Sequence, residues 1–285
     1  MSTILLALAV IAATTPGLLV SPAELAAALN DPATVVVAVG NSPDEFIAGH
    51  VPDARFVRYD QIAIDVDGLQ SELPPVDQLL TVLASIGISD TSKIIIYGSP
   101  IAATRLFFTL DYLGHPNLRV LNGGLAAWKA SGGAIEISAP KVVKAGMLTP
   151  RVHPERVVSA EWIKERLSSP KITLLDARPD QEFTGADGGM GGAHVKGHLP
   201  DAHQLVWNTL LDSSGRFLPD AELKKKYDAI GAVSGTPLVS YCMVGMRASV
   251  TSFVARHLGY DARLYDGSIV DWTRRRLPAV TGAKD

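Results

Sequence analysis

The chain has a single cysteine, Cys242, among its 285 residues. One thiol excludes an intramolecular disulfide, and it also excludes a zinc or iron–sulfur site built from several cysteines. A lone cysteine is either a small buried apolar residue or a reactive thiol. The composition leaves both alternatives open, so the surroundings of Cys242 in the sequence have to decide between them.

Excess charge and long apolar runs are missing as well. A formal net charge of −3 argues against a nucleic-acid-binding protein, which needs a clustered cationic face. No apolar run reaches the roughly 18 residues of a membrane helix, so we expect no transmembrane span. The chain is 47% hydrophobic and 19% charged, which suits a buried core rather than a disordered chain. At roughly 150 residues per domain, the length predicts about two domains, with one large domain as the alternative.

The N-terminus carries one short apolar run, ILLALAVIAA, over residues 4–13. Its length suits a secretory signal peptide better than a membrane span, although no Lys or Arg precedes it. An apolar strand or helix packed on the protein is the alternative. We expect residues 1–16 to be a signal peptide or an apolar extension, and the protein to be periplasmic or secreted, with a cytoplasmic location as the alternative.

The sequence repeats itself with an offset near 140 residues. Ser21 opens the helical pattern SPAELAAAL and Ser159 opens SAEWIKERL, each with Ser as the N-cap and Glu in the first turn. Further matches follow in the same order: Gly49–Ala54 with Gly197–Ala202, Ile94–Tyr97 with Leu238–Tyr241, and Gly123, Gly124 and Trp128 with Gly267, Ser268 and Trp272. We infer a duplicated domain, and call its halves the first copy and the second copy.

Short buried strands alternate with helices in both copies, for example Val35–Val39 and Ile172–Leu175. This alternation predicts an α/β fold, in which each copy is a mostly parallel sheet with helices on both faces. We expect the first domain over residues 17–137, a polar, proline-containing linker over 138–156 and the second domain over 157–285. Ligands bind at the carboxyl ends of such strands, which directs attention to the loop after Tyr241.

That loop, residues 242–247, reads Cys-Met-Val-Gly-Met-Arg and is called the cysteine loop below. Gly245 allows successive backbone amides to converge, and the following helix and Arg247 add positive charge. These features stabilise a thiolate, whereas an inert strand-end cysteine needs none of them. The sequence therefore favours Cys242 as a nucleophile that works without a cofactor or a metal.

The cysteine loop combines with Asp176-Ala177-Arg178, Glu182-Phe183, the GHLPDA turn and Asp266-Gly267 with Trp272. Together these motifs resemble the tandem-domain rhodanese family of thiosulfate and 3-mercaptopyruvate sulfurtransferases, over residues from about 17 to 280. The loop pattern, which ends in an arginine, is most similar to that of bacterial thiosulfate sulfurtransferases. The resemblance implies two rhodanese-like domains of which the second is active. The first copy has no thiol after Tyr97, and residues 38–41 lack both Asp and Arg.

The resemblance also implies a function and a set of site residues. Cys242 would take sulfane sulfur from thiosulfate as a persulfide and pass it to cyanide or a thiol. Anion binding falls to the rest of the loop, namely Met243, Val244, Gly245, Met246 and Arg247. Asp176 and Arg178 are expected to form a buried pair that holds the loop, with Ser249 as a further support. Glu182 stands where animal members carry a donor-binding arginine, which leaves the donor to Arg247 and the loop backbone.

Other functions remain as alternatives. The loop matches neither animal pattern and contains the apolar Met243 and Val244, which keeps 3-mercaptopyruvate open as the donor. A Cdc25-type phosphatase or arsenate reductase needs C-x5-R, whereas Cys242 and Arg247 give C-x4-R. A non-catalytic sulfur-binding module predicts a degraded loop. We expect a monomer that binds only small molecules.

Two smaller signals remain. Three histidines, His194, His198 and His203, are spaced in a way that suggests metal binding, but His50 repeats His198 in the copy without chemistry, which favours a role in stabilising the turn. The glycine-rich segment 184–196 is either a surface loop or a gate, and we expect it near the mouth of the cleft.

Overall fold

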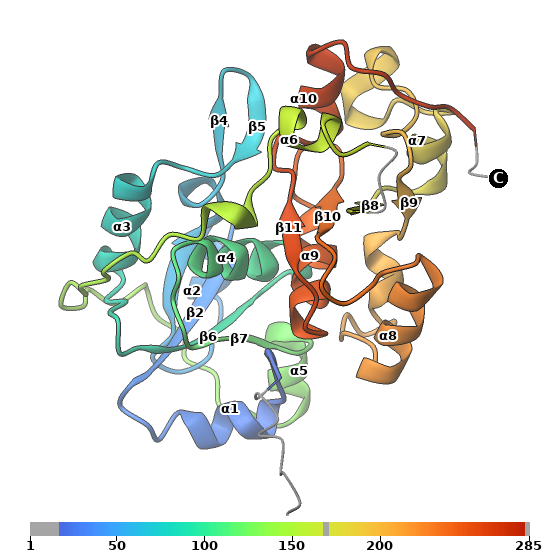
Figure 1. Cartoon of the computed structure of the whole chain (residues 1–285). Helices are drawn as coiled ribbons and strands as arrows, with labels where there is room; N and C mark the ends of the chain where they lie inside the picture. The colour runs from blue at the N-terminus through green and yellow to red at the C-terminus, as the bar shows by residue number, and fades with distance from the viewer. Residues whose placement is uncertain (1–16, 168–170, 283–285) are drawn as a thin grey trace, which may run out of the picture.

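The chain builds two parallel sheets, one from each copy of the repeat (Figure 1). The computed structural model describes residues 17–167 and 171–282, so the expected signal peptide lies outside the described residues. The first sheet has the order β1-β7-β6-β2-β3 and the second β11-β10-β8-β9, and the paired strands within each run parallel. The expected α/β class, with a mostly parallel sheet in each copy, is confirmed.

The strands of the first sheet are β1 (Leu19–Val20), β2 (Thr34–Gly40), β3 (Arg55–Arg58), β6 (Lys93–Gly98) and β7 (Leu118–Leu121). Those of the second are β8 (Thr173–Asp176), β9 (His203–Gln204), β10 (Leu238–Tyr241) and β11 (Ala262–Leu264). An antiparallel hairpin of β4 (Ile64–Val66) and β5 (Leu69–Glu72), absent from our expectations, is added in the first copy.

The helices of the first copy are α1 (Pro22–Ala28), α2 (Pro43–Ile47), α3 (Val76–Ser85), α4 (Pro100–Tyr112) and α5 (Gly124–Ala130). Those of the second are α6 (Ala160–Lys164), α7 (Asp180–Thr184), α8 (Asp220–Ala229), α9 (Ala248–His257) and α10 (Ser268–Arg274). Short 3-10 helices are η1 (Tyr59–Gln61), η2 (Pro154–Arg156), η3 (Gly189–His194) and η4 (Trp207–Leu210). Both predicted N-caps are present, because the side chains of Ser21 and Ser159 accept from backbone amides in the first turns of α1 and α6.

Alternate residues of the buried strands pack into two different hydrophobic cores. Val36 and Ile95 pack with α1, α2 and α5, whereas their neighbours Val37 and Ile96 pack with α3 and α4. The period of two along a strand places these neighbours on opposite faces. Helices therefore cover both faces of the first sheet, as expected.

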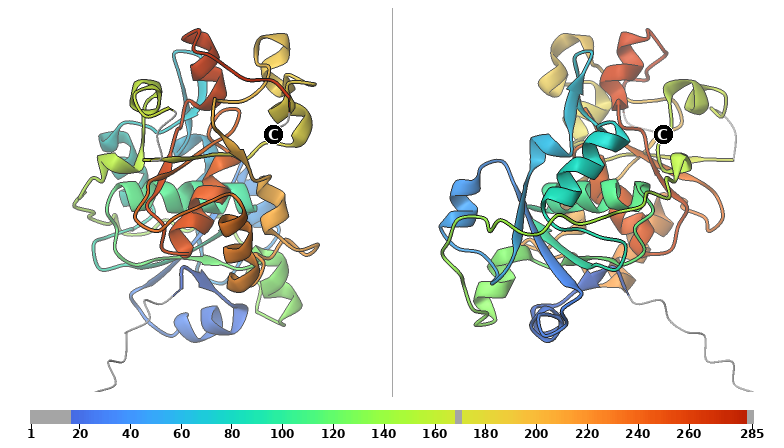
Figure 2. Two further views of the ribbon diagram at one scale, coloured as in Figure 1. Left: turned by 45° about the vertical axis from the view of Figure 1, so that its right-hand side comes forward. Right: turned by 90° about the vertical axis from the view of Figure 1, so that its left-hand side faces the viewer.

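The two copies share one core. Helices α4 and α9 lie side by side between the sheets, and the views in Figures 1 and 2 agree on this. The rings of Phe107 and Phe253 meet edge to face there, with centroids 4.9 Å apart. Residues 139–153, between the copies, contain no helix or strand. The helices in the described part of the chain are too short or too polar to cross a membrane.

The duplicated GH-x-PDA turn is built in the same way twice. The rings of His50 and Phe46 stack with centroids 3.7 Å apart, and those of His198 and Phe183 do so at the same distance. Each imidazole Nδ1 also bonds the carbonyl oxygen of that phenylalanine, at 2.8 and 2.9 Å. The predicted turn-stabilising role of His198 is confirmed, and no metal-binding group of His, Cys, Asp and Glu occurs among residues 17–167 and 171–282.

Candidate active site

Cys242 is the first residue after β10 and begins the six-residue cysteine loop that leads into α9. Its side chain is fully buried and packs with Phe108, Ala177, Ala248 and Leu264. Phe108 belongs to α4 of the first copy, so the thiol lies where the two domains meet. Burial alone is also what an inert cysteine would show, so the case for a reactive thiol depends on the polar groups around the loop.

Ser268 holds two of the loop amides. Its Oγ accepts hydrogen bonds from the backbone N–H groups of Cys242 and Gly245, at 3.1 and 3.0 Å, and donates to the carbonyl oxygen of Tyr265 at 2.9 Å. Ser268 has a positive φ of 51°, a region that favours glycine, and Gly124 occupies the matching place in the first copy with φ 55°. Our list of site residues missed Ser268, and the replacement of Gly124 by serine in a repeated turn was the available signal.

Other amides of the loop have no protein acceptor. Within the described part of the chain, no atom accepts a hydrogen bond from the N–H groups of Met243, Val244, Met246 or Arg247. Unclaimed amides in one short loop are suited to an anion. The loop thus divides its amides, two held by a serine and others available to a bound anionic group.

Arg247 does not stand free in the site. It forms a two-pronged ion pair with Glu182 of α7, with both N–O distances 2.8 Å. Burial lowers the pKa of Arg247, but the hydrogen bonds to Glu182 and the negative charge of a Cys242 thiolate outweigh it and raise that pKa. The sequence did not predict this pairing of opposite charges, and donor binding by Arg247 stays a prediction.

The glycine-rich segment lies against this pair through Gly189, and its expected place at the mouth of a cleft stays a prediction. Gly189, at the start of η3, has a φ of 54° and sits on the side chains of Met243 and Glu182. A Cβ added at Gly189 would lie 2.7 Å from Met243 Cε and 2.8 Å from Glu182 Cδ. A larger residue at this position would have to displace the ends of these two side chains and adopt a backbone conformation that favours glycine.

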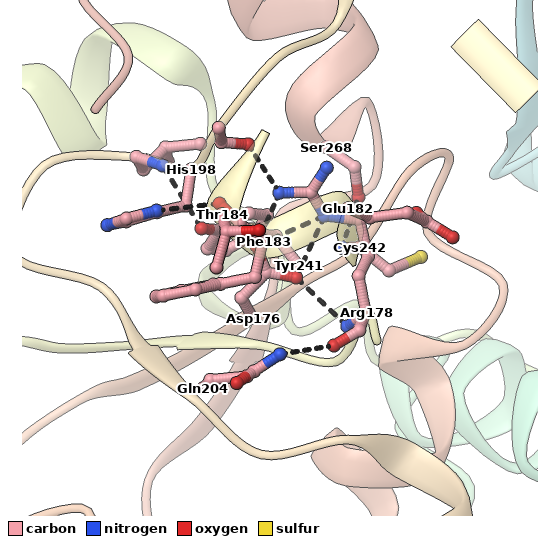
Figure 3. Close-up of polar contacts among 12 residues, drawn as sticks. Asp176, Arg178, Glu182, Phe183, Thr184, His198, Gln204, Tyr241, Cys242 and Ser268 are labelled. Carbon is pink, nitrogen blue, oxygen red and sulfur yellow. Dashed lines mark hydrogen bonds and ion pairs between the residues drawn. The ribbon is translucent and has the colours of Figure 1, made fainter. Parts of the chain in front are cut away.

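Asp176 and Arg178 form the expected buried pair at the end of the neighbouring strand (Figure 3). Both side chains are completely buried; Arg178 Nη2 donates to Asp176 Oδ2 at 2.6 Å and to the carbonyl oxygen of Gly197 at 2.7 Å. Burial lowers the pKa of Arg178, but the charge of Asp176 and its hydrogen bonds, with smaller contributions from Tyr241 and Glu182, together outweigh burial and raise that pKa. The pair is joined to the residue before the cysteine, because Asp176 lies opposite Tyr241 and the Ala177 N–H donates to the Tyr241 carbonyl at 2.9 Å.

A second buried ion pair, which we did not predict, crosses between the domains. Arg105 of α4 donates to both carboxylate oxygens of Asp266, at 2.5 and 3.0 Å, and the backbone N–H of Leu73 donates to the same carboxylate at 2.7 Å. Ser249 also links the copies, since its Oγ lies 3.0 Å from Thr104 Oγ1 and 2.7 Å from the Met246 carbonyl oxygen. The first copy therefore contributes charge and hydrogen bonds to the site as well as packing.

Comparison with known proteins identifies the repeat unit. The family model described as "Rhodanese-like domain" matches residues 21–131 and again residues 159–275. The two matches coincide with the two halves of the repeat, and each contains one parallel sheet.

Curated relatives match nearly the whole chain. It is 31% identical over 279 residues to a thiosulfate sulfurtransferase of Corynebacterium glutamicum, covering 94% of this chain and 91% of the relative. It is 29% identical over 284 residues to a probable 3-mercaptopyruvate sulfurtransferase of Pseudomonas aeruginosa, covering 93% and 98%. It is 27% identical over 260 residues to a thiosulfate sulfurtransferase of Azotobacter vinelandii, covering 90% and 93%. Among solved structures, YnjE shares the fold with a TM-score of 0.85 at 24% identity, over 94% of this chain and 69% of that one.

Proposed function

The chain belongs to the rhodanese family and is an enzyme of the rhodanese type, and from that premise we propose that it moves sulfane sulfur from thiosulfate to cyanide or a thiol through a persulfide on Cys242. The observation that carries this proposal is the cysteine loop: a lone thiol at a strand end, followed by amides that no atom of the described residues accepts from. Such amides stabilise the anionic sulfur of both the thiolate and the persulfide.

The proposed reaction is a double displacement. The Cys242 thiolate attacks the outer sulfur of thiosulfate, the S–S bond of the donor breaks, and sulfite leaves with the bonding electron pair. The acceptor then attacks the outer sulfur of the persulfide, and the electron pair of the Cys242–sulfur bond returns to Cys242. Cyanide becomes thiocyanate. A thiol acceptor first loses its proton to solvent, and the resulting thiolate becomes a persulfide. The loop amides face an anion in each state, so they need not rearrange between the two steps.

3-Mercaptopyruvate is the second candidate donor, and one feature of the site favours it. Glu182 neutralises Arg247, and Met243 and Val244 are buried and apolar, so the loop offers a dianion little side-chain cation. A donor with a singly charged carboxylate would lose less electrostatic binding free energy through this pairing than the thiosulfate dianion would. The ratio of kcat/KM for the two donors on purified protein separates them, and a large preference for mercaptopyruvate would replace thiosulfate while keeping the persulfide chemistry.

The direct test of the chemistry replaces the thiol with a hydroxyl. We expect Cys242→Ser to lose sulfur transfer by about a thousandfold or more, as for other essential nucleophiles. After treatment with thiosulfate, the intact mass of the wild type should rise by one sulfur atom, and cyanide should remove it. The variant should gain none. Equal turnover by the variant, or an active wild type that never carries the extra sulfur, would show that Cys242 is not the carrier.

Export and oligomeric state form a separate proposal. We propose that the apolar run at residues 4–13 directs the protein out of the cytoplasm and that it acts there as a monomer. N-terminal sequencing of the protein from its native host tests the first part, since a terminus at Met1 or Ser2 contradicts cleavage. Light scattering of purified protein tests the second, and a stable dimer mass contradicts it.

A further inference from the structure

The ion pair between Arg105 and Asp266 is the most buried contact between charges of the two domains. Arg105 is 0% exposed and Asp266 is 2% exposed. Removing two such charges from water is costly, so a buried pair is weak evidence for a stabilising role. A functional reason for keeping the pair has to be sought in what Asp266 touches.

Asp266 lies directly beneath the cysteine loop. A Cβ added at Gly245, whose φ is 79°, would stand 2.5 Å from Asp266 Oδ1 and 2.8 Å from its carbonyl oxygen. Two residues further along the same turn, Ser268 holds the amides of Cys242 and Gly245. The position of the Asp266 carboxylate and the shape of the loop therefore depend on each other.

The first copy shows what this turn looks like without the chemistry. By the offset of 144 residues that relates Gly123 to Gly267, Asp266 corresponds to Asn122 and Leu73 to Phe217. Asn122 Oδ1 accepts from the Phe217 N–H at 2.8 Å, as Asp266 accepts from Leu73 at 2.7 Å. A neutral amide is thus sufficient for the backbone contact.

The partner of the carboxylate differs as well. The place in α9 that matches Arg105 in α4 is held by Ser249, counted from the strand ends, or by Val250, counted from the helix ends. Neither residue is charged. The carboxylate and its arginine occur together only on the side of the molecule that carries the cysteine.

We propose that Arg105, in the copy that has no cysteine, is a positioning residue for the cysteine loop and acts on it through Asp266. It clamps the carboxylate with two hydrogen bonds, which fixes the turn that holds the loop. It also cancels a negative charge that would otherwise repel the Cys242 thiolate. The role in turnover rests on the proposed function of the loop, whereas the effect on the thiol does not.

Other groups near the pair make this cancellation necessary. Burial, and then the charge of Asp266, raise the pKa of Glu72 to about 8, while Arg105 lowers it. Burial also raises the pKa of Tyr59, whose Oη has no hydrogen-bond partner among the described residues. The charged groups facing the loop from its other side are Glu182 and Arg247, which neutralise each other. Arg105 is therefore the cation that balances Asp266.

The test measures the Cys242 thiol directly. Because the chain has one cysteine, the ultraviolet absorbance of the thiolate reports its titration without ambiguity below the range where tyrosines ionise. For Arg105→Met we expect the thiol pKa to rise by about one unit, which is about tenfold less thiolate below that pKa. In the thiosulfate–cyanide assay we expect kcat to fall about tenfold, with a smaller change in KM.

Asp111→Asn is the matched control. Asp111 lies on α4 as Arg105 does, and pairs across the domain boundary with Arg256 at 2.8 Å, but it does not touch the cysteine loop. We expect this variant to lose stability without a change in the thiol pKa. The double variant Arg105→Met with Asp266→Asn reproduces the uncharged arrangement of the first copy, and its thiol pKa should return towards that of the wild type.

Three results would overturn the proposal. One is an unchanged thiol titration in Arg105→Met; the second is the same shift in Asp111→Asn; the third is a double variant whose thiol pKa stays as high as that of Arg105→Met. If Arg105→Met does not fold, the double variant and Arg105→Lys replace it in the test. Lysine keeps the positive charge but cannot form both hydrogen bonds to the carboxylate, so Arg105→Lys should lower kcat. A wild-type kcat in Arg105→Lys would contradict the clamp. Because the titration needs no donor, it remains decisive even if thiosulfate proves to be the wrong substrate.

Discussion

The two copies differ most sharply in the residues that follow their central strands. Counted from Tyr97 and Tyr241, six residues of the first copy, 98–103, match the cysteine loop. In the first copy α4 already begins at Pro100, with Ser99 as its N-cap accepting from the Ala102 N–H at 3.2 Å. In the second copy all six residues of the cysteine loop stay outside the helix, and α9 begins at Ala248. The first copy uses these residues for a helical turn, whereas in the second copy four of the six loop amides have no acceptor among the described residues.

This difference separates the fold from the chemistry. The stacked histidine turn is the same in both copies, and so is the tryptophan contact, since Trp128 and Trp272 each donate to a carbonyl six residues later at 2.8 Å. The first copy cannot recover its thiol by one substitution, because a Cβ at Gly98 would collide with the carbonyl oxygen of Val39. The comparison teaches that the parallel sheet and its turns persist in both copies while the strand-end loop differs between them.

The largest effect that sharpens this comparison is expected at Ser268. Ser268→Gly gives the second copy the residue that the first copy carries as Gly124, and glycine accepts the positive φ without strain. It removes the acceptor for the Cys242 and Gly245 amides, each hydrogen bond contributing about 1 kcal/mol. We expect kcat to fall about tenfold in the thiosulfate–cyanide assay.

The reverse change, Gly124→Ser, is the matched control for that experiment. It adds a side chain at the corresponding turn of the copy without a thiol. We expect this variant to lose some stability, and we expect the folded protein to keep the wild-type kcat. Equal losses of kcat in the two variants would mean that Ser268 acts only on the fold.

The next largest effect concerns the charge beside the loop. Glu182→Gln removes the carboxylate that pairs with Arg247 and leaves the guanidinium available to an anionic donor. We expect KM for thiosulfate to fall severalfold at low salt, with a smaller effect at high salt, because a released cation attracts a dianion and salt screens that attraction.

Glu45 stands in the matching position of the first copy, so Glu45→Gln is the control and should leave KM unchanged. An unchanged or higher KM in Glu182→Gln would show that Arg247 steadies the loop rather than meeting the donor.

The smallest expected effect is a pH dependence of stability that originates in the first copy. The pKa of Glu72 is raised from 4.5 to about 8, by burial first and then by Asp266. Between these two pH values the folded state keeps a proton that the unfolded state has lost, so the wild type loses stability as the pH rises from about 4.5 to about 8. Glu72→Gln should show a shallower decline in urea-unfolding free energies. If unfolding free energy falls with pH in parallel for the two proteins, the Glu72 carboxyl is solvated and does not cause the decline.

Much of this molecule follows from local patterns in the sequence. The N-caps at Ser21 and Ser159, the strand Leu238–Tyr241 and the start of α9 after six loop residues lie where the sequence predicts them. Hydrophobic period, capping chemistry and the repeat are all readable within short windows. The Asp176–Arg178 pair was predictable for the same reason, since its members are two residues apart at one strand end.

The contacts that tune the site could not be read in this way. Glu182 and Arg247 are 65 residues apart, and Arg105 and Asp266 are 161 residues apart in different copies. The sequence does not show which of these charges pair, because burial and contact are properties of the assembled core rather than of the residue. The repeat offset did contain a signal, the replacement of Asn122 by Asp266 and of Gly124 by Ser268, but it gave no partner for either.

The sequence by itself determined a duplicated α/β chain with one thiol at the end of one central strand, because strands, caps and repeats are local. The tertiary structure alone decided that this thiol is buried between the copies, that Arg247 is neutralised by Glu182 and that an arginine of the copy without the thiol reaches the turn beneath the loop. Coulombic and hydrogen-bond energies depend on separations in space of a few ångströms, and only folding brings such distant residues together.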